Sequence, residues 1–383
     1  MPLHGLRAVF MRGGTSKALM FQRRDLPERQ EDWAPIFLAA MGAPDPNGRQ
    51  LDGMGGGVSS LSKVCVIGPP THPEADVDYT FVQVGIDDAT VDYGGNCGNM
   101  SSAVGPFAVD EGLVKALADG PTTVRIHNTN TRKLIVARFA IEGGRAAVRG
   151  PFAIDGVSGT GAPIRLEFRD LAGARTGRLL PTGEPLDSLS LPGRRVVRAS
   201  LVDAANPCVF VDAADLGLIG NEPPENIAKN DALMADLEAL RRQAAILMRL
   251  APDLDAAAAS RSVPFIGLVA PPRAWRTQSG IDRSAAEADI AVRMLSSGHP
   301  HRAIPITSAL CVAVACRTPG TLPAQLCSSA TGPLRIGHAS GTVMVEAEQD
   351  RHQGRVLHAS VYRTARRLFQ GEVMYSEPAG DPS

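Results

Sequence analysis

Two stretches of this chain have the length of a helix and are apolar nearly all round. They are residues 98–112, GNMSSAVGPFAVDEG, and residues 307–317, TSALCVAVACR. A helix without a polar face has to be covered on every side by other elements. Most of the remaining pattern is typical of short β-strands, so the two helices predict two β-layers, each curled around one central helix. The predicted fold class is therefore α+β.

The two halves of the chain repeat the same order of elements. Residues 7–21 read as strand, tight loop and strand, and so do residues 198–212. The segment SLSKVCVIGPP at 60–70 has an echo in SVPFIGLVAPP at 262–272. Self-similarity of this kind predicts a duplicated αβ unit. The alternative is a coincidence between generic strand-turn patterns.

The duplication sets the expected domain boundaries. We expect an N-terminal domain over residues 1–188, a C-terminal domain over 189–375 and a flexible tail over 376–383. Two domains also suit a length of 383 residues. Amphipathic helices are predicted over 28–42 in the first domain and over 224–250 in the second.

Composition limits the possible partners. The net charge is −1, from 40 acidic and 39 basic residues, so no strong field favours nucleic acid or an anionic membrane. Aromatic residues make up only 4%, too few for base-stacking platforms. The six cysteines are scattered, no 18-residue apolar run occurs, and the N-terminus lacks the apolar run of a signal peptide. These features predict a cytoplasmic protein that binds a small molecule.

Cys97 is the first candidate for chemistry. It stands at the start of the first apolar helix, between glycines, in GGNCGNM. Unpaired backbone N–H groups and the positive end of the helix dipole both favour the thiolate, which is the usual setting of a reactive cysteine. Gly98, Asn96 and Asn99 would complete a cradle for a carboxylate. The alternative is a small apolar residue packed at a helix start.

Lys63 is the second candidate. It follows Ser59, Ser60 and Ser62 after a glycine-rich loop and enters an apolar strand. A lysine that begins a buried strand loses hydration, which favours the neutral amine and makes it a candidate base. The alternative is an ordinary lysine at a strand end whose ammonium reaches water.

Several polar residues in turns are candidates for anion binding. The turn MRGGTSK at 11–17 carries Arg12, and ANPCVF at 205–210 carries Asn206. The segment HPHRAIPITS at 299–308 precedes the second apolar helix, but its two histidines lack a third metal ligand. Neither a metal nor an organic cofactor is expected, because no nucleotide-binding or metal motif is present.

Six motifs, in this order and over nearly the whole chain, resemble the PrpF family. They are MRGGTSK, DGMGGGVSSLSK, DYGGNCGNMSSAVGPFAVDEGLV, ANPCVFVDA, ADIAVRMLS and IGHASG. This family includes methylaconitate cis–trans isomerase, methylitaconate isomerase and the oxalomesaconate isomerases and tautomerases. The resemblance implies a diaminopimelate-epimerase-like fold, with a central helix in each of two related domains and a site in the cleft between them. It also implies cofactor-independent proton transfer on unsaturated di- or tricarboxylates.

Carried over by matching position, Lys63 corresponds to the family's catalytic lysine and Cys97 to the cysteine of its conserved motif. In the related epimerases and racemases a second cysteine opens the second helix, whereas this chain has AIPITS there. A two-thiol racemase is therefore disfavoured. The residues expected to bind substrate are Arg12, Thr15, Ser16, Ser62, Asn96, Gly98, Asn99, Asn206, Thr307, Ser308 and Ser340.

The sequence thus predicts an isomerase that moves or rotates a carbon–carbon double bond by proton abstraction and return. A 2-methylaconitate-like acid is the preferred substrate class, and an oxalomesaconate-like acid is the alternative. Three other hypotheses stay open: a racemase, a carboxylate-binding relative without turnover, and a cysteine hydrolase, although no histidine is near Cys97 in sequence. A homodimer is an open alternative to the monomer.

Overall fold

The computed structural model describes residues 3–115, 118–191, 193, 195–260, 263–350 and 356–376. The chain divides into two compact units. Unit 1 takes in the chain up to Glu167 and again from Arg363 onwards, and unit 2 runs from Phe168 to Tyr362. None of the helices in these described ranges has the length and apolar content needed to cross a bilayer.

Among its described residues, unit 1 contains two α-helices and most of the first half's strands. The helices are α1 (Trp33–Met41) and α2 (Gly98–Asp110). The strands are β1 (Leu3–Gly13), β2 (Ser16–Gln22), β3 (Lys63–Gly68), β4 (Val77–Val84), β5 (Val91–Asp92), β6 (Gly120–Asn128), β7 (Lys133–Glu142), β8 (Arg145–Ala146), β9 (Phe152–Ala153), β10 (Thr160–Gly161) and β23 (Ala365–Ser376). The strand β11 (Ile164–Arg169) carries the chain into unit 2.

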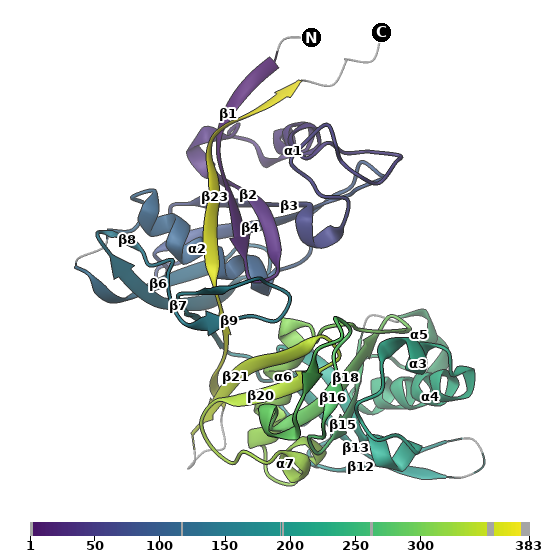
Figure 1. The fold of residues 1–383 in the computed structure, drawn as a ribbon. Coiled ribbons are helices and arrows are strands. Elements are labelled where there is room, and N and C mark those ends of the chain that lie inside the picture. Colours follow the sequence, from purple (N-terminus) through teal and green to yellow (C-terminus); the bar gives the residue numbers. More distant parts are fainter. Residues whose placement is uncertain are drawn as a thin grey trace. The chain divides into compact units, whose positions relative to one another are not determined.

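The two helices of unit 1 cover opposite faces of its sheet. Strands alternate their side chains between faces, and Val64, Val66 and Val82 pack in one cluster with Phe37 of α1. The residues between them in the strands point to the other face, which α2 covers. Tyr79 on β4 is an example, because it interacts electrostatically with Cys97 at the start of α2. Helix α2 contacts β1, β2, β3, β6, β7, β8 and β23, so its apolar surface is covered on all sides. Figure 1 shows β1 and β23 side by side next to α2.

Unit 2 contains five helices among its described residues. They are α3 (Pro224–Ala228), α4 (Asp231–Leu247), α5 (Leu254–Ala259), α6 (Ile306–Arg317) and α7 (Leu322–Leu326). The strands are β12 (Asp187–Ser190), β13 (Val196–Ala204), β14 (Asn206–Asp212), β15 (Phe265–Ala270), β16 (Trp275–Arg276), β17 (Asp282–Arg283), β18 (Ile290–Ser296), β19 (His299–Pro300), β20 (Leu334–His338), β21 (Gly341–Gln349) and β22 (Val356–Arg363).

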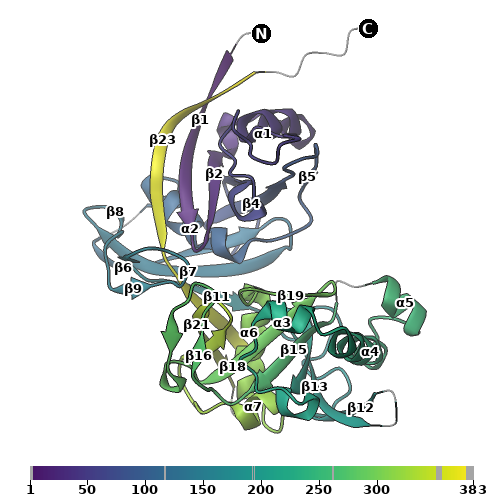
Figure 2. The ribbon, with the colours of Figure 1, turned by 45° about the vertical axis from the view of Figure 1, so that its right-hand side comes forward.

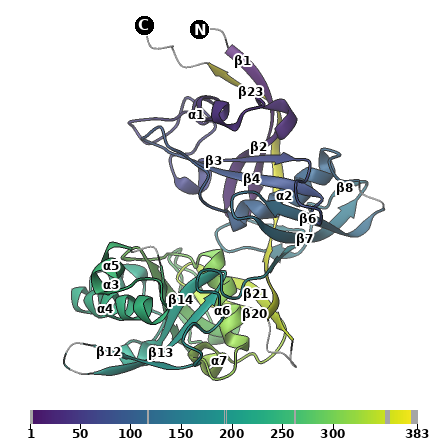
Figure 3. The same cartoon turned by 180° about the vertical axis from the view of Figure 1, so that it is seen from behind.

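The same two-faced packing recurs in unit 2. One cluster joins Leu233, Leu237 and Leu240 of α4 to the sheet residues Val209 and Leu268. Helix α6 instead contacts β13, β14 and β21, and its residues 308–316 are buried. Helices α4 and α5 lie at one side of this unit in Figure 2, and α3 lies together with them at one side in Figure 3.

The order and direction of strand pairing are identical in the two units. In unit 1 the order is β23, β1, β2, β3, β4, β6, β7, β8, and in unit 2 it is β12, β13, β14, β15, β18, β20, β21, β22. In both, the pairs alternate between antiparallel and parallel from the second strand to the sixth, so β2–β3 and β4–β6 are parallel, as are β14–β15 and β18–β20. The predicted fold class is confirmed. The two units repeat the same order and direction of strands.

The division between the units differs from the expected boundary after residue 188. Residues 168–188 belong to unit 2 because the Ala205 amide donates to the Leu171 carbonyl and the Asp203 carboxylate accepts from the amides of Arg175 and Thr176. The end of the chain returns to unit 1, where β23 pairs along β1. Ser376 closes that strand opposite Leu3, and the rest of the expected tail, 377–383, lies outside the described residues.

The predicted helices appear with changed ends. The pattern over 28–42 gives only α1, which ends where Gly42 adopts a left-handed φ of 72°. The pattern over 224–250 gives two helices, because the side chain of Asn230 accepts the Leu233 N–H at 3.1 Å and starts a new helix there. The two all-apolar helices extend over 98–110 and 306–317, as expected within two residues at each end.

Candidate functional site

The β1–β2 turn lies directly against the first turn of α2. A Cβ atom on Gly13 would come within 2.7 Å of the Asn99 carbonyl oxygen, and one on Gly14 would overlap Asn99 Oδ1. Gly14 also has a positive φ of 52°, which side chains rarely adopt. The two glycines of MRGGTSK are therefore required by the close approach of this turn to α2.

Cys97 is the N-cap residue of α2. Its backbone is extended and its side chain makes no capping hydrogen bond. The first intrahelical bond runs from the Ser101 amide to the Cys97 carbonyl, at 2.9 Å. The amides of Gly98, Asn99 and Met100 precede that bond and have no partner in the helix ladder. A half-buried thiol thus stands beside three donor groups at the positive end of a helix.

Asn99 joins the turn, the helix and the C-terminal segment. Its Nδ2 donates to Thr15 Oγ1 at 3.1 Å, and its Oδ1 accepts from Arg363 Nε at 3.1 Å. Arg363 is buried, and burial lowers the pKa of Arg363 to about 10 while the electrostatic effect of Cys97 opposes the shift. A buried guanidinium therefore lies within electrostatic reach of the Cys97 sulfur.

Arg12 fastens the same turn. Its Nη1 donates to the Gly14 carbonyl at 2.9 Å and to the Thr364 carbonyl at 3.0 Å. Burial and the charge of Arg366 lower the pKa of Arg12. Ser16, the first residue of β2, is 3% exposed, whereas Thr15 is exposed at the tip of the turn.

Lys63 opens β3 and its amine is held by one side-chain amide. Its side chain is buried, and Nζ donates to Oε1 of Gln83, the cross-strand neighbour on β4. The Gln83 Nε2 donates in turn to the carbonyls of Ser62 at 2.8 Å and Ser59 at 3.1 Å, which fixes its oxygen toward the lysine. In the described part of the chain no carboxylate forms an ion pair with Lys63.

Lys63 and Cys97 border the same buried cluster. The Lys63 Nζ lies 5.1 Å from the centre of the Phe81 ring, and a Cβ atom on Gly95 would contact that ring at 3.9 Å. Both Cys97 and Lys63 act electrostatically on Cys65, although burial is the main cause that raises the pKa of this thiol. Both groups therefore lie close to the sheet face that packs on α2.

Two other predicted residues have internal partners. The Ser62 hydroxyl is fully buried and accepts from Gln50 Nε2 at 2.8 Å. Asn96 Oδ1 accepts from Ser101 Oγ at 3.4 Å and from Asn128 Nδ2 at 3.3 Å. Asn96 belongs to the loop before α2, whereas Ser62 is held inside the unit.

The remaining predicted residues are in unit 2. Asn206 begins β14, where its Nδ2 donates to the Pro207 carbonyl. Helix α6 starts after Pro305, with Thr307 exposed in its first turn and Ser308 fully buried with an Oγ that has no hydrogen-bond partner. Ser340, in the β20–β21 turn, donates to the Arg302 carbonyl at 2.7 Å, just ahead of α6.

The histidines near α6 are held by neighbouring side chains and backbone. His301 Nε2 is 2.7 Å from Ser296 Oγ, and burial lowers the pKa of His301. His338 Nδ1 accepts the Ser340 N–H at 3.2 Å. Across the ranges that the structure describes, no three His, Cys, Asp or Glu side chains gather as a metal site.

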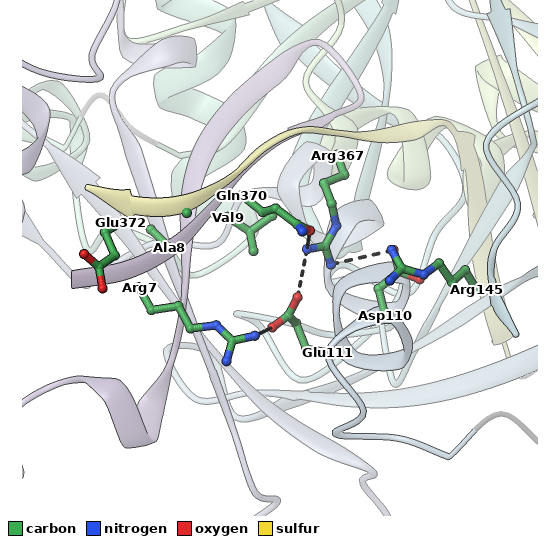
Figure 4. A pocket seen from close by; sticks show the side chains of 10 residues that line it. Arg7, Ala8, Val9, Asp110, Glu111, Arg145, Arg367, Gln370 and Glu372 are labelled. Atoms are coloured by element: carbon green, nitrogen blue, oxygen red, sulfur yellow. Dashed lines mark hydrogen bonds and ion pairs between the residues drawn. The ribbon is translucent and has the colours of Figure 1, made fainter. Parts of the chain in front are cut away.

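A cavity of about 410 Å³ opens at the other end of α2, away from Cys97. Figure 4 shows Glu111 between Arg7 and Arg367, to which it is bonded at 2.9 and 2.8 Å. Asp110 lies 3.7 Å from Arg367. The acidic side chains thus neutralise the arginines, and none of the predicted site residues lines this cavity. The predicted site residues Cys97, Gly98 and Asn99 lie instead at the N-terminal end of α2.

Comparison with known proteins decides the family. The family described as PrpF protein matches residues 4–376. The chain belongs to the PrpF family. Its relatives in that family include the 3-methylitaconate isomerase of Eubacterium barkeri, which is 43% identical over 97% of each chain. The 2-methyl-aconitate isomerase of Shewanella oneidensis is 38% identical, again over 97% of each. The (4E)-oxalomesaconate Delta-isomerase of a Novosphingobium species is 40% identical over 95% of this chain and 96% of its own.

Solved structures agree with the PrpF assignment. A methylitaconate-delta-isomerase crystal structure superposes with a TM-score of 0.91 at 40% identity, covering 100% of both chains. A probable proline racemase is similar with a TM-score of 0.50 at 12% identity, covering 98% of this chain and 94% of its own, which shows a likeness of fold alone.

Two residues at the site were not predicted from the sequence of this PrpF protein. Arg363 is 264 residues from Asn99 in the chain, so only the folded C-terminal segment brings them together. Gln83 is 20 residues from Lys63, and their contact depends on the register of β3 and β4. The sequence contained a signal for Gln83 but none for Arg363. Gln83 is a polar residue in the buried strand VDYTFVQV, and a buried polar side chain needs a hydrogen-bond partner.

Proposed function

We propose that this PrpF protein is a cofactor-independent isomerase of an unsaturated di- or tricarboxylic acid of the 2-methylaconitate or methylitaconate type. One observation carries the proposal: in unit 1, the buried amine of Lys63 and the N-cap residue Cys97 border the same cluster around Cys65 and Phe81. Relatives of 38–43% identity bear the names of isomerases of such acids.

Lys63 acts as the base in this proposal. A C–H bond next to a carbon–carbon double bond and a carboxylate is weakly acidic, because its electron pair spreads into a dienolate. The neutral amine of Lys63 takes that proton and becomes an ammonium, with the Gln83 carbonyl oxygen as its acceptor. Gln83 is itself fixed by backbone carbonyls, so the amine is already oriented before substrate arrives.

The start of α2 stabilises the negative charge. The amides of Gly98, Asn99 and Met100 surround the substrate carboxylate into which the charge moves, and each such donor is typically worth ~3 kcal/mol in the transition state. Arg363 adds a positive charge behind Asn99. Thr15 and Arg12 belong to the turn that closes this end of the helix.

Cys97 returns a proton in the second half of the reaction. Its S–H bond breaks as the new C–H bond forms at the other end of the allylic system, and the electron pair of the dienolate becomes the shifted double bond. The thiolate that remains is stabilised by the helix amides and by Arg363 until solvent exchange with the Lys63 ammonium restores both groups. Rotation about the transient single bond, followed by return of a proton to the carbon that lost one, gives the cis–trans outcome instead.

The other predicted ligands stay predictions. No binding role is assigned beyond the sequence prediction to the following residues: Ser16, Ser62 and Asn96 of unit 1, and Asn206, Thr307, Ser308 and Ser340 of unit 2. A location in the reducing cytoplasm is also proposed, and it is supported by six cysteines that are all unpaired.

Incubation with candidate acids in deuterated water tests the function. Methylitaconate, 2-methylaconitate and oxalomesaconate are each followed by proton NMR, with and without EDTA. We expect one of the first two to be isomerised with deuterium incorporation at full rate in both conditions. Turnover of oxalomesaconate alone would move the assignment to tautomerisation. Calorimetric binding of an acid without any exchange would contradict the enzyme and leave a binding protein.

A further inference from the structure

The turn between β6 and β7 carries asparagine and threonine side chains that the proposed reaction does not use. Strand β6 runs parallel to β4, and its last residue, Asn128, is paired with Tyr79. The next partner along that edge of β4 is β5, which begins its pairing at Gln83 with Asp92. Between these two partners, the edge of β4 at Phe81 has no neighbouring strand and lies beside the turn.

Asn130 fills this gap in the sheet. Its Oδ1 accepts the Phe81 N–H at 2.8 Å, and its Nδ2 donates to the Phe81 carbonyl at 2.9 Å. A neighbouring strand would occupy the same donor and acceptor. The same Nδ2 also donates to the Tyr93 carbonyl at 2.7 Å. One side-chain amide thus joins β4 to residues 93–96, the loop that leads from β5 to Cys97.

Asn128 makes a second connection to the same loop. This side chain is fully buried, and its Oδ1 accepts the Thr131 N–H at 2.8 Å and the Thr131 hydroxyl at 2.7 Å. Those bonds orient the amide so that its Nδ2 donates to Asn96 Oδ1 at 3.3 Å and to Asn130 Oδ1 at 3.4 Å. Because Asn96 directly precedes Cys97, both ends of the loop are attached to the β6–β7 turn.

The loop has few other fixed points. Among the described residues, its backbone makes no backbone–backbone hydrogen bond, and its Gly94 N–H donates to Asp92 Oδ1 at 2.7 Å. Two of its four residues are glycines, which allow many backbone conformations unless other groups hold them. Phe81, by contrast, is also paired with Cys65 of β3. The loop therefore depends on the two asparagines more than the sheet does.

We infer that Asn130 is a positioning residue that holds Cys97 at a fixed place relative to Lys63. The inference rests on the proposed function, since it assigns no new reaction to the site. Asn130 is bonded to the backbone of Phe81, whose ring centre lies 5.1 Å from Lys63 Nζ. It is bonded as well to the loop that leads into the N-cap of α2. The two groups of the reaction therefore share one side-chain amide as a common support.

Two substitutions of Asn130 test the inference. Asn130→Asp keeps the size of the side chain and an acceptor for the Phe81 N–H, but it has no N–H to donate to the Phe81 and Tyr93 carbonyls. Asn130→Ala removes all three bonds without adding a charge. A shift of about 1 Å in a reacting group can cost about 10²-fold in rate, so we expect kcat to fall about 10- to 100-fold in both variants, with KM changed less than about threefold.

The ratio of solvent exchange to product formation separates positioning from a general loss of stability. The substrate is whichever of methylitaconate and 2-methylaconitate the wild-type protein isomerises, in deuterated water. Lys63 should still remove and exchange the substrate proton in both variants, whereas product formation, which needs Cys97, should fall. The exchange-to-product ratio should therefore rise about tenfold. An unchanged ratio, with exchange and product lost in step, would overturn the inference.

Alkylation of Cys97 by iodoacetamide provides a readout that needs no turnover. At about pH 9.5 ordinary cysteine thiols are deprotonated, so the rate measures access, and release of the loop should raise it at least about threefold. Cys327, which is also half-buried, is the internal reference and should react at an unchanged rate. Faster alkylation of Cys97 in variants of a protein that isomerises no acid would contradict the proposed function and support the positioning role. Alkylation at the wild-type rate in both variants would overturn that role.

The matched control is Asp119→Ala. The Asp119 carboxylate accepts the amides of Gly143 and Gly144 at 2.9 and 3.1 Å, so this variant also removes side-chain bonds between two connecting segments of unit 1. Thermal unfolding should show a lower melting temperature in all three variants. Asp119→Ala should nevertheless keep the wild-type kcat and the wild-type alkylation rate of Cys97. An equal fall of kcat in this control would show that any lost connection in unit 1 has the same effect, and would overturn the inference.

Discussion

The beginnings of α2 and α6 occupy the same place in the repeated topology but differ in chemistry. Each helix follows a short strand paired to the fifth strand of its sheet, β5 on β4 in unit 1 and β19 on β18 in unit 2. The N-cap of α2 is Cys97, flanked by glycine, and the N-cap of α6 is Pro305, which has no thiol. The duplicated scaffold supplies two covered helices, and of these two only α2 begins with a thiol.

The fourth strands of the two sheets, β3 and β15, differ in the same way. Lys63 opens β3, while the equivalent first residue of β15 is Phe265, whose ring stacks on His301 at 5.9 Å. Both groups that the proposed reaction needs are therefore in unit 1. A racemase that uses a thiol at the start of each central helix lacks the second one here, because the N-cap of α6 is Pro305. The proposed lysine–cysteine isomerase has both of its groups in unit 1.

The largest expected effect comes from removing the lysine. Lys63→Ala should lower kcat by about 10²–10⁴, the usual contribution of a general base. Steady-state isomerisation measures the loss. The matched control is Lys133→Ala, which removes an exposed lysine that also opens a strand of unit 1 and should keep full activity. Equal activity of the two variants would refute the lysine's role.

Removal of the thiol should have the next largest effect. Cys97→Ser replaces the proton donor by a far weaker acid, and we expect kcat to fall at least about tenfold. Thermal unfolding serves as the control, since the side chain makes no capping bond that serine would lose. If the variant keeps wild-type kcat, the α2 start has no chemical role and the contrast with α6 disappears.

Two buried arginines, one in each unit, allow a direct comparison of the two units by mutation. Burial lowers the pKa of both Arg363 in unit 1 and Arg293 in unit 2 to about 10. Arg363→Met should reduce kcat/KM about tenfold, because a charged donor near the reacting carboxylate is lost. Arg293→Met removes bonds to the Glu222 and Val292 carbonyls, so it should lower the melting temperature and spare kcat/KM. The reverse pattern would contradict the placement of the site.

The smallest effect on rate is expected at the turn. Gly14→Ala combines left-handed strain of roughly 1–2 kcal/mol with overlap on Asn99 that adds roughly 1–3 kcal/mol. Gly144→Ala has similar strain, at a φ of 74°, with nothing within 4 Å of the new Cβ. Urea unfolding should show the larger loss for Gly14→Ala, with a fall of a few-fold in kcat/KM. Equal losses of unfolding free energy in the two variants would show that the close approach of the turn to α2 does not make Gly14→Ala more destabilising.

Local pattern was enough for part of this account. The two central helices could be predicted because a helix that is apolar on every side has to be covered by other elements. Cys97 and Lys63 could be predicted because a cysteine is unusual at a helix start and a lysine is unusual in a buried strand. The domain boundary could not be predicted from local pattern, because β23 returns to pair with β1 and so joins residues more than 350 positions apart. Arg363 depends on that same return, and the split of α3 from α4 depends on one capping asparagine.

The ratio of solvent exchange to product formation tests the central claim most directly. In deuterated water, wild-type protein should exchange and isomerise its substrate together. Cys97→Ser should still exchange the abstracted hydrogen while product formation falls at least about tenfold, and Lys63→Ala should lose both. Exchange by Lys63→Ala at the wild-type rate would show that another group takes the proton.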